Sequence, residues 1–183
     1  MLRQASLSIA QRSDRFTAVA RSLASLQDLG CDLPAAGERW LLPLNWDEPD
    51  RFLASLDHHV QVIGIPTLVV AWIHDMSLGK RVAELFSTTA NACDFFHILG
   101  SASANPAVAV SAPLSNASPN RLAYHRVILG FRRTQNRSRW LTNAEISNGV
   151  LDAIVSNKPQ HVVGQIEPWG QRPNALAFLM PSE

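Results

Sequence analysis

Residues Pro66 to His74 form an almost continuous run of β-branched and aliphatic side chains. A run of this length and composition predicts a strand that is covered on both faces, as in a parallel sheet. The run ends in Trp72, Ile73 and His74, so that a large ring and an imidazole follow the buried segment. Carboxyl ends of strands face the ligand crevice in open α/β sheets, which makes this end the first candidate for a functional site.

Other apolar segments predict strands at residues 16–21, 40–45, 95–101, 122–131 and 161–166. Apolar residues at helical spacing predict helices at residues 1–12, 23–29, 77–90 and 142–154. A further helix is expected to begin at Asp47-Glu48-Pro49-Asp50, because a carboxylate cap and an early proline favour a helix start. Phe52, Leu56 and Val60 are expected to line its inner face at helical spacing. Thr142-Asn-Ala-Glu145 predicts a capping box at the start of the helix at 142–154. Gly30 is expected to end the helix at 23–29, and Pro43 favours an edge position for its strand.

Strands and helices alternate along the chain, and this order predicts the α/β class. The expected architecture is a Rossmann-like, doubly wound parallel sheet joined by right-handed crossovers. At 183 residues the chain is long enough for one such domain and short for two, so we treat residues 1–183 as a single domain. Prolines spread through residues 102–120 argue against a long regular helix there.

The charge balance limits the classes of partner. The formal net charge is +1 and 17% of the residues are charged, which argues against a nucleic-acid partner. One local basic cluster consists of Arg132, Arg133, Arg137 and Arg139. A solvated turn is the favoured interpretation of this cluster. The alternative, an arginine patch for nucleic acid, requires salt-sensitive binding that is lost when Arg132 and Arg133 are replaced.

Cysteine usage and hydropathy indicate a cellular compartment. Cys31 and Cys93 are isolated and show neither metal spacing nor a disulfide framework, which fits a reducing environment. No apolar run approaches the roughly 20 residues of a membrane span, and no signal pattern opens the chain. We therefore expect a cytoplasmic protein with no membrane partner.

His58 and His59 are interpreted as stabilised by a helix carboxyl end, and no metal is expected.

Several segments also occur in a recognisable order: Phe16 to Arg21, Leu44 to Asp47, Thr67 to His74, Phe95 to Ser101, and Arg139 to Thr142 with the helix that follows. In register, they resemble the short-chain dehydrogenase/reductase family, especially a divergent bacterial branch of short proteins. In that family the arginine that closes the second strand, here Arg21, commonly meets the 2′-phosphate of NADP. Asn45 and Trp46 fall in the segment that resembles the adenine-contacting turn, with Asn45 where an aspartate is more usual.

The resemblance extends to the next two strands. The fourth strand of the family ends in Asn-Asn-Ala-Gly, and the corresponding residues here are Ala71, Trp72, Ile73 and His74. The fifth strand leads to the catalytic serine, and residues 95–101 resemble it. The resemblance therefore implies that Ala71 to His74 and Gly100 contact an NADP or NAD cofactor, and that Ser101 contacts a substrate carbonyl or a ribose. A strand-end serine satisfied by the backbone is the alternative for Ser101.

Two family features are missing. Neither the first strand nor the glycine-rich turn, which brings backbone close to the pyrophosphate, precedes the helix at residues 1–12. We expect an amino-terminal truncation; a neighbouring chain or a rearranged segment is the alternative. The family also uses a Tyr and a Lys four residues apart on one helix. The only tyrosine, Tyr124, lies in a predicted strand and is followed four residues later by Ile128.

The leading hypothesis is an NAD(P)-dependent oxidoreductase that transfers a hydride to or from a small carbonyl or alcohol, with NADP favoured by Arg21. The main alternative is a non-catalytic Rossmann module that binds a nucleotide, or nothing, and acts through protein contacts. His74 and His97 lie where they could act as acid or base, but a core or loop histidine with one hydrogen-bond partner is the favoured interpretation of each. The substrate and the oligomeric state, including a homo-oligomer, stay open.

Overall fold

The computed structural model describes residues 1–87, 92–104, 122–134 and 137–173. The strands are β1 (Arg15–Ala20), β2 (Glu38–Pro43), β3 (Leu68–Ala71), β4 (Cys93–Leu99), β5 (Leu122–Leu129), β6 (Phe131–Arg133), β7 (Ser138–Trp140) and β8 (Gln160–Val163). The helices are α1 (Arg3–Ala10), α2 (Leu23–Asp32), α3 (Pro49–Ile63), α4 (Met76–Ser87) and α5 (Asn143–Ser156), with single 3-10 turns η1 (Ser101–Ala104) and η2 (Trp169–Gln171).

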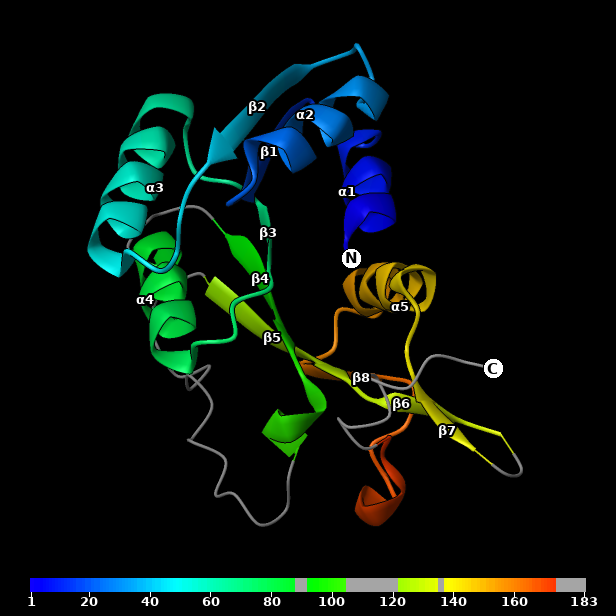
Figure 1. The fold of residues 1–183 in the computed structure, drawn as a ribbon. Coiled ribbons are helices and arrows are strands. Elements are labelled where there is room, and N and C mark those ends of the chain that lie inside the picture. The colour runs from blue at the N-terminus through cyan, green and yellow to red at the C-terminus, as the bar shows by residue number, and fades with distance from the viewer. Residues whose placement is uncertain (88–91, 105–121, 135–136, 174–183) are drawn as a thin grey trace.

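The strands form three sheets (Figure 1). A four-stranded parallel sheet has the order β3-β4-β5-β8, and a separate two-stranded parallel sheet pairs β1 with β2. The third sheet is the antiparallel hairpin β6-β7. Among the described residues, α2 connects β1 to β2, α4 connects β3 to β4, and α5 lies between β5 and β8, as crossovers between parallel strands require. The α/β class and the Rossmann-like parallel arrangement predicted from the sequence are therefore confirmed.

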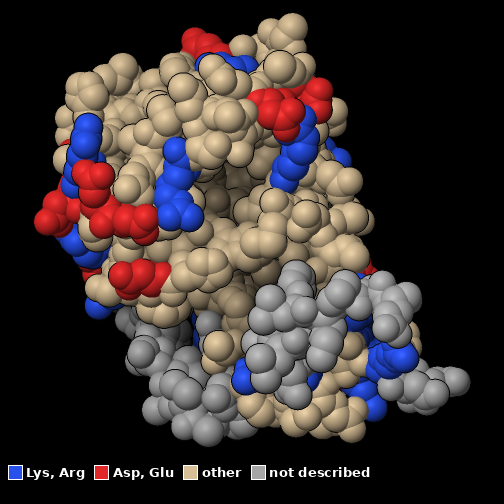
Figure 2. Space-filling view, viewed as in Figure 1, with Lys and Arg blue, Asp and Glu red and all other residues tan. Residues whose placement is uncertain are grey.

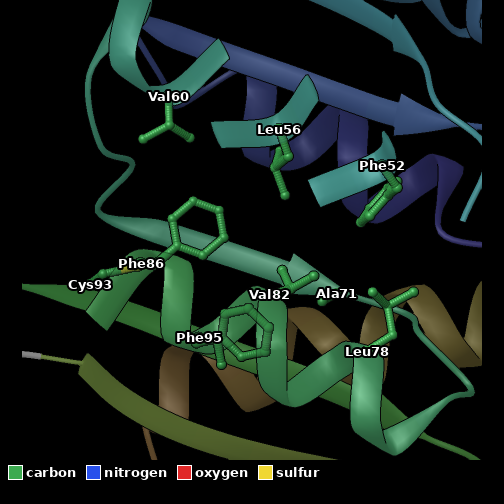
Figure 3. Close-up of a cluster of buried hydrophobic side chains, with 10 residues drawn as sticks. Phe52, Leu56, Val60, Ala71, Leu78, Val82, Phe86, Cys93 and Phe95 are labelled. Carbon is green, nitrogen blue, oxygen red and sulfur yellow. The ribbon is translucent and has the colours of Figure 1, made fainter. Parts of the chain in front are cut away.

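Helices cover both faces of the four-stranded sheet. On one face, α3 and α4 pack on β3 and β4 through a cluster that includes Phe52, Phe86 and Phe95 (Figure 3). On the other face, α1 and α5 pack through a second cluster that includes Ala5 and Val150. A third cluster joins α2 to β1 and β2. Coverage of both faces explains why these strands read as continuous apolar runs in the sequence.

Local sequence signals account for the two best-defined helices. Pro49 stands at the start of α3, and the predicted inward residues Phe52, Leu56 and Val60 are all buried. The predicted capping box opens α5: the Thr142 hydroxyl accepts a hydrogen bond from the Glu145 backbone N–H, and the Glu145 carboxylate accepts one from the Thr142 N–H.

Three sequence predictions need correction. Gly30 does not end its helix, because α2 continues to Asp32; Gly30 instead lies close to Leu41, whose Cδ1 would be 2.9 Å from an added Cβ. The strand at Pro66 to His74 is shorter than predicted, and it lies at the edge of its sheet, with Leu68 only half-buried. Among the described residues, 16–20 pair with β2 alone and not with β3, so the expected single sheet is divided.

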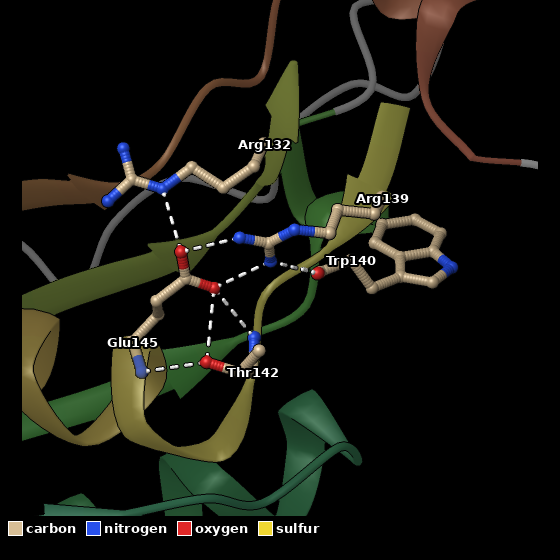
Figure 4. A network of polar contacts seen from close by, with 5 residues as sticks. All are labelled: Arg132, Arg139, Trp140, Thr142 and Glu145. Carbon is tan, nitrogen blue, oxygen red and sulfur yellow. Dashed lines mark hydrogen bonds and ion pairs between the residues drawn. The ribbon is translucent and has the colours of Figure 1, made fainter. Parts of the chain in front are cut away.

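The arginine cluster is not a simple solvated turn. Arg132 lies in β6 and Arg139 in β7, and both guanidinium groups bind the Glu145 carboxylate (Figure 4). These contacts tie the hairpin to the first turn of α5.

Among the described residues, no helix combines the length and apolar character needed to cross a membrane.

Candidate functional site

The carboxyl ends of the parallel strands carry the residues that the sequence assigned to the cofactor and the substrate. Arg21 follows β1, Asn45 and Trp46 follow β2, and Gly100 and Ser101 follow β4. Ala71 closes β3, and residues 72–74 continue from it. Figure 2, in the same view as Figure 1, shows a hollow near the middle of this face, in the region where the ribbon places β3. The candidate residues thus lie at the carboxyl ends of strands from two separate sheets, and their roles stay predictions.

A cation and an indole ring meet at the ends of β1 and β2. The guanidinium carbon of Arg21 lies 4.6 Å from the centre of the Trp46 ring, which is a cation–π distance. The same guanidinium forms an ion pair with Asp47, with Nη1 2.9 Å from Oδ2. Leu44 N–H donates to the Ala20 carbonyl at 3.0 Å and holds the two strand ends together. The result is an exposed arginine lying flat on an aromatic ring.

Asn45 shapes the turn that follows β2. Its Oδ1 accepts a hydrogen bond from the Asp47 backbone N–H at 3.1 Å, which is an Asx turn. This turn carries Trp46 and Asp47 toward Arg21. The sequence assigned Asp47 only to the start of α3; its pairing with Arg21 was missed, because the partner lies 26 positions away in the chain.

The end of β3 presents an indole and an exposed imidazole. The rings of Trp72 and His74 make an edge contact with centroids 6.0 Å apart. Trp72 Nε1 is buried and has no hydrogen-bond partner among the described residues. Asp75 binds the start of α4, because its carboxylate accepts hydrogen bonds from the backbone N–H groups of Ser77 and Leu78. His74 therefore has no acidic partner in Asp75, in agreement with the sequence argument.

Gly100 and Ser101 lie at the end of β4. A Cβ added to Gly100 would meet no atom of the described residues within 4 Å, so the backbone borders open space in that part of the structure. Ser101 is half-buried and begins η1. The structure places Ser101 at a strand end next to this space, and its role stays a prediction. Most of the predicted irregular stretch at 102–120 lies outside the described residues.

Beneath this edge, the buried His97 pairs with the half-buried Tyr124. His97 is fully buried; its Nε2 lies 2.9 Å from the Ile73 carbonyl, and its Nδ1 lies 2.5 Å from the Tyr124 hydroxyl. A carbonyl can only accept, so Nε2 carries the hydrogen and the Tyr124 hydroxyl donates to Nδ1. Burial raises the pKa of Tyr124 to about 12 and lowers the pKa of His97 below its ordinary value. Neither group is prepared for proton transfer near neutral pH.

The described part of the chain contains no group of three His, Cys, Asp or Glu side chains suited to a metal ion. No protein-family model matches this chain, and no characterised protein matches it at a significant level. The site is therefore interpreted from its own chemistry. Half-buried indole rings, one exposed arginine and open backbone at the ends of parallel strands suit a flat, anionic ligand.

Proposed function

We propose that the carboxyl edge of the parallel strands binds a nicotinamide dinucleotide, with NADP preferred, and that the protein acts as a short-chain dehydrogenase/reductase-like oxidoreductase on a small carbonyl or alcohol. The observation that carries this proposal is the Arg21 guanidinium stacked on Trp46 at 4.6 Å. A cation on an aromatic face, at adjacent ends of two parallel strands, suits a ligand that combines a phosphate with a flat base.

The other residues have distinct roles in this proposal. Asn45 and Trp46 contact the adenine, and Arg21 pairs with the 2′-phosphate. Residues Ala71 to His74 and Gly100 border the nicotinamide side of the crevice. Open space at Gly100 supports this assignment, because backbone without a Cβ lets a ligand approach closely. With the cofactor bound, Ser101 would donate a hydrogen bond to the substrate carbonyl oxygen. The cofactor would supply or accept the hydride, and water would supply or accept the accompanying proton.

A second candidate function is a nucleotide-binding module without catalysis. The His97–Tyr124 hydrogen bond favours it, since the only tyrosine of the chain is committed to a contact with a fully buried histidine. The two functions share the binding site and differ in turnover. Cofactor binding and cofactor consumption therefore have to be measured separately.

Titration of the protein with NADPH and with NADH, followed by tryptophan fluorescence, tests the shared binding step. Replacement Arg21→Ala removes a charge-assisted contact worth about 1.5–3 kcal/mol, so NADPH affinity should fall about tenfold or more while NADH affinity changes little. Arg15→Ala is the matched control: Arg15 begins the same strand at its opposite end and pairs with Glu38 at 3.4 Å.

Equal loss of affinity for both cofactors, or no loss, would refute the assigned role of Arg21. An absence of binding by either cofactor would refute the proposal as a whole. If NADPH binds but small aldehydes, ketones and alcohols cause no change in absorbance of the reduced cofactor, the binding module is the correct function.

A further inference from the structure

A second arginine lies on an indole ring beyond the carboxyl end of β8. The guanidinium carbon of Arg172, which follows η2, is 4.5 Å from the centre of the Trp169 ring. Arg172 is exposed, and within the described ranges it pairs with no carboxylate. A stacked guanidinium uses its flat face on the ring, so the N–H groups at its edge stay available to bind an oxyanion. The indole therefore holds an unpaired cation in a fixed orientation.

The hairpin β6-β7 packs beside this stack (Figure 1). Phe131 and Gln165 exchange two backbone hydrogen bonds, at 2.8 and 2.9 Å, which join β6 to the segment that follows β8. The Ser138 hydroxyl of β7 donates a hydrogen bond to the Gln171 carbonyl, next to Arg172 in the chain. One face of the hairpin therefore lies against η2.

The same face of the hairpin carries another exposed arginine. Arg133 is directly opposite Ser138 in the β6-β7 register, and the side chains of such a pair lie on one face, with Cβ atoms about 4.5–5.5 Å apart. On the other face, Arg132 and Arg139 share the Glu145 carboxylate (Figure 4). Arg133 has no such partner among the residues that the structure describes. Positive charge is thus uncompensated on the face that meets η2.

We propose that Arg133 and Arg172 form a binding site for a phosphate group, either the free ion or a monoester of a small molecule. Two unpaired guanidinium groups match the charge of about −1.5 to −2 that a phosphate monoester carries near neutral pH, and their planar donors bind phosphate oxygens in pairs. The nearby Glu167 carboxylate is engaged at the start of η2, where it accepts the Trp169 N–H at 3.0 Å. This inference is independent of the proposed function, because neither arginine is assigned to the cofactor or the substrate.

Isothermal titration calorimetry with inorganic phosphate at low ionic strength tests the site. Arg133→Ala and Arg172→Ala should each weaken phosphate binding about tenfold or more, since each removes a charge-assisted contact. Arg132→Ala is the matched control: it removes the same charge from the neighbouring position, on the opposite face of the hairpin, and should change the affinity less than about twofold. Arg21→Ala, at the proposed cofactor site, should leave phosphate binding unchanged.

A second measurement uses the unmodified protein, which keeps the test decisive if a variant does not fold. The indole N–H signal of Trp169 in the NMR spectrum should shift with inorganic phosphate and with phenyl phosphate, and should not shift with sodium chloride at the same ionic strength. Acetate should bind at least about tenfold more weakly than phosphate, because it carries a single charge.

Loss of phosphate affinity in both Arg133→Ala and Arg172→Ala, with Arg132→Ala unaffected, supports the proposal. Equal weakening by Arg132→Ala and Arg133→Ala would mean diffuse attraction to the hairpin and would overturn it. Loss of binding only in Arg21→Ala would place the phosphate at the ends of β1 and β2 instead. A protein that binds no phosphate, or binds acetate equally well, has no phosphate site here, and the proposal is then wrong.

Discussion

The hydroxyl of Tyr124 donates a hydrogen bond to Nδ1 of a fully buried His97, with the two atoms 2.5 Å apart. The opposite ring nitrogen of His97 donates to the Ile73 carbonyl, directly below the candidate site. The hydrogen bond to Tyr124 therefore links β4 to β5, and the hydrogen bond to Ile73 links β4 to the segment that follows β3. Because both polar atoms of the imidazole are satisfied, the pair stabilises the strand ends that carry the site.

Removal of the tyrosine hydroxyl should reduce stability without changing cofactor binding. In Tyr124→Phe the Nδ1 atom of His97 loses its partner, and an unsatisfied buried acceptor costs about 1–3 kcal/mol. Urea unfolding should give a lower midpoint by that amount, while NADPH affinity of the folded protein stays the same. Loss of turnover with unchanged stability would contradict a structural role for Tyr124.

Stability should decrease in mild acid because of His97. Burial is the main cause of its lowered pKa; Arg126 adds to the effect and the hydrogen bond to Ile73 opposes it. Below the ordinary histidine value of 6.5 the unfolded chain takes up a proton that folded His97 resists, so the free energy of unfolding falls as the pH falls. Above that value the contribution is complete.

Urea unfolding at about pH 7.5 and about pH 5.5 measures this dependence, whose slope for one group is at most about 1.4 kcal/mol per pH unit. His97→Gln should flatten the slope in that range. His59 also has a lowered pKa, so His59→Gln is the control that separates the two contributions. An unchanged slope in His97→Gln would show that His97 takes up its proton at the same pH in the folded and unfolded protein, so that folding does not lower its pKa.

Features that depend on nearby residues were predictable from the sequence. The spacing of Phe52, Leu56 and Val60 gave the buried face of α3, and Thr142 with Glu145 gave the start of α5. The parallel class followed from apolar runs without alternation. Each of these signals lies within one turn or one strand, where periodicity and capping act directly.

Contacts between distant parts of the chain were not predictable in the same way. The ion pair of Arg21 with Asp47 and the helical position of Gly30 depend on how β1, β2 and α2 pack together. Tyr124 was predicted to lie in a strand, and it does, but its partner His97 belongs to the neighbouring strand. The division between β1 and β3 likewise reflects strand pairing, which no local pattern encodes.

The capping box of α5 gives a direct stability test. Thr142→Ala removes the hydroxyl that accepts the Glu145 N–H and should destabilise the protein by about 1 kcal/mol. Thr142→Ser keeps the hydroxyl and should unfold close to the wild-type midpoint. The comparison is made by urea unfolding at neutral pH, where the Glu145 carboxylate is ionised because Arg139 and the Thr142 N–H hold its pKa well below its usual range.

Replacement by alanine should destabilise the protein at Gly79 and leave its stability almost unchanged at Gly100. A Cβ at Gly79 would collide with the His97 ring in the core, so Gly79→Ala should cost about 1–3 kcal/mol. Gly100→Ala adds the same atom where no neighbour lies within 4 Å, and its unfolding midpoint should change little. A stable Gly100→Ala protein with weaker NADPH binding would place the cofactor against this strand end. Equal destabilisation of both variants would contradict the open space at Gly100.

Asp47 should limit the affinity of Arg21 for a phosphate. The Asp47 carboxylate is already paired with the Arg21 guanidinium, with Oδ2 2.9 Å from Nη1. Its negative charge also repels an incoming anion. Exposed ion pairs contribute about 0.2–1 kcal/mol, so Asp47→Asn should raise NADPH affinity about two- to fivefold and leave NADH affinity unchanged. Asp50→Asn is the matched control, because Asp50 forms a comparable exposed pair with Arg81 at 2.7 Å. A gain for NADH as large as for NADPH would mean that Arg21 does not read the 2′-phosphate, and that Asp47 acts on the ligand only through its charge.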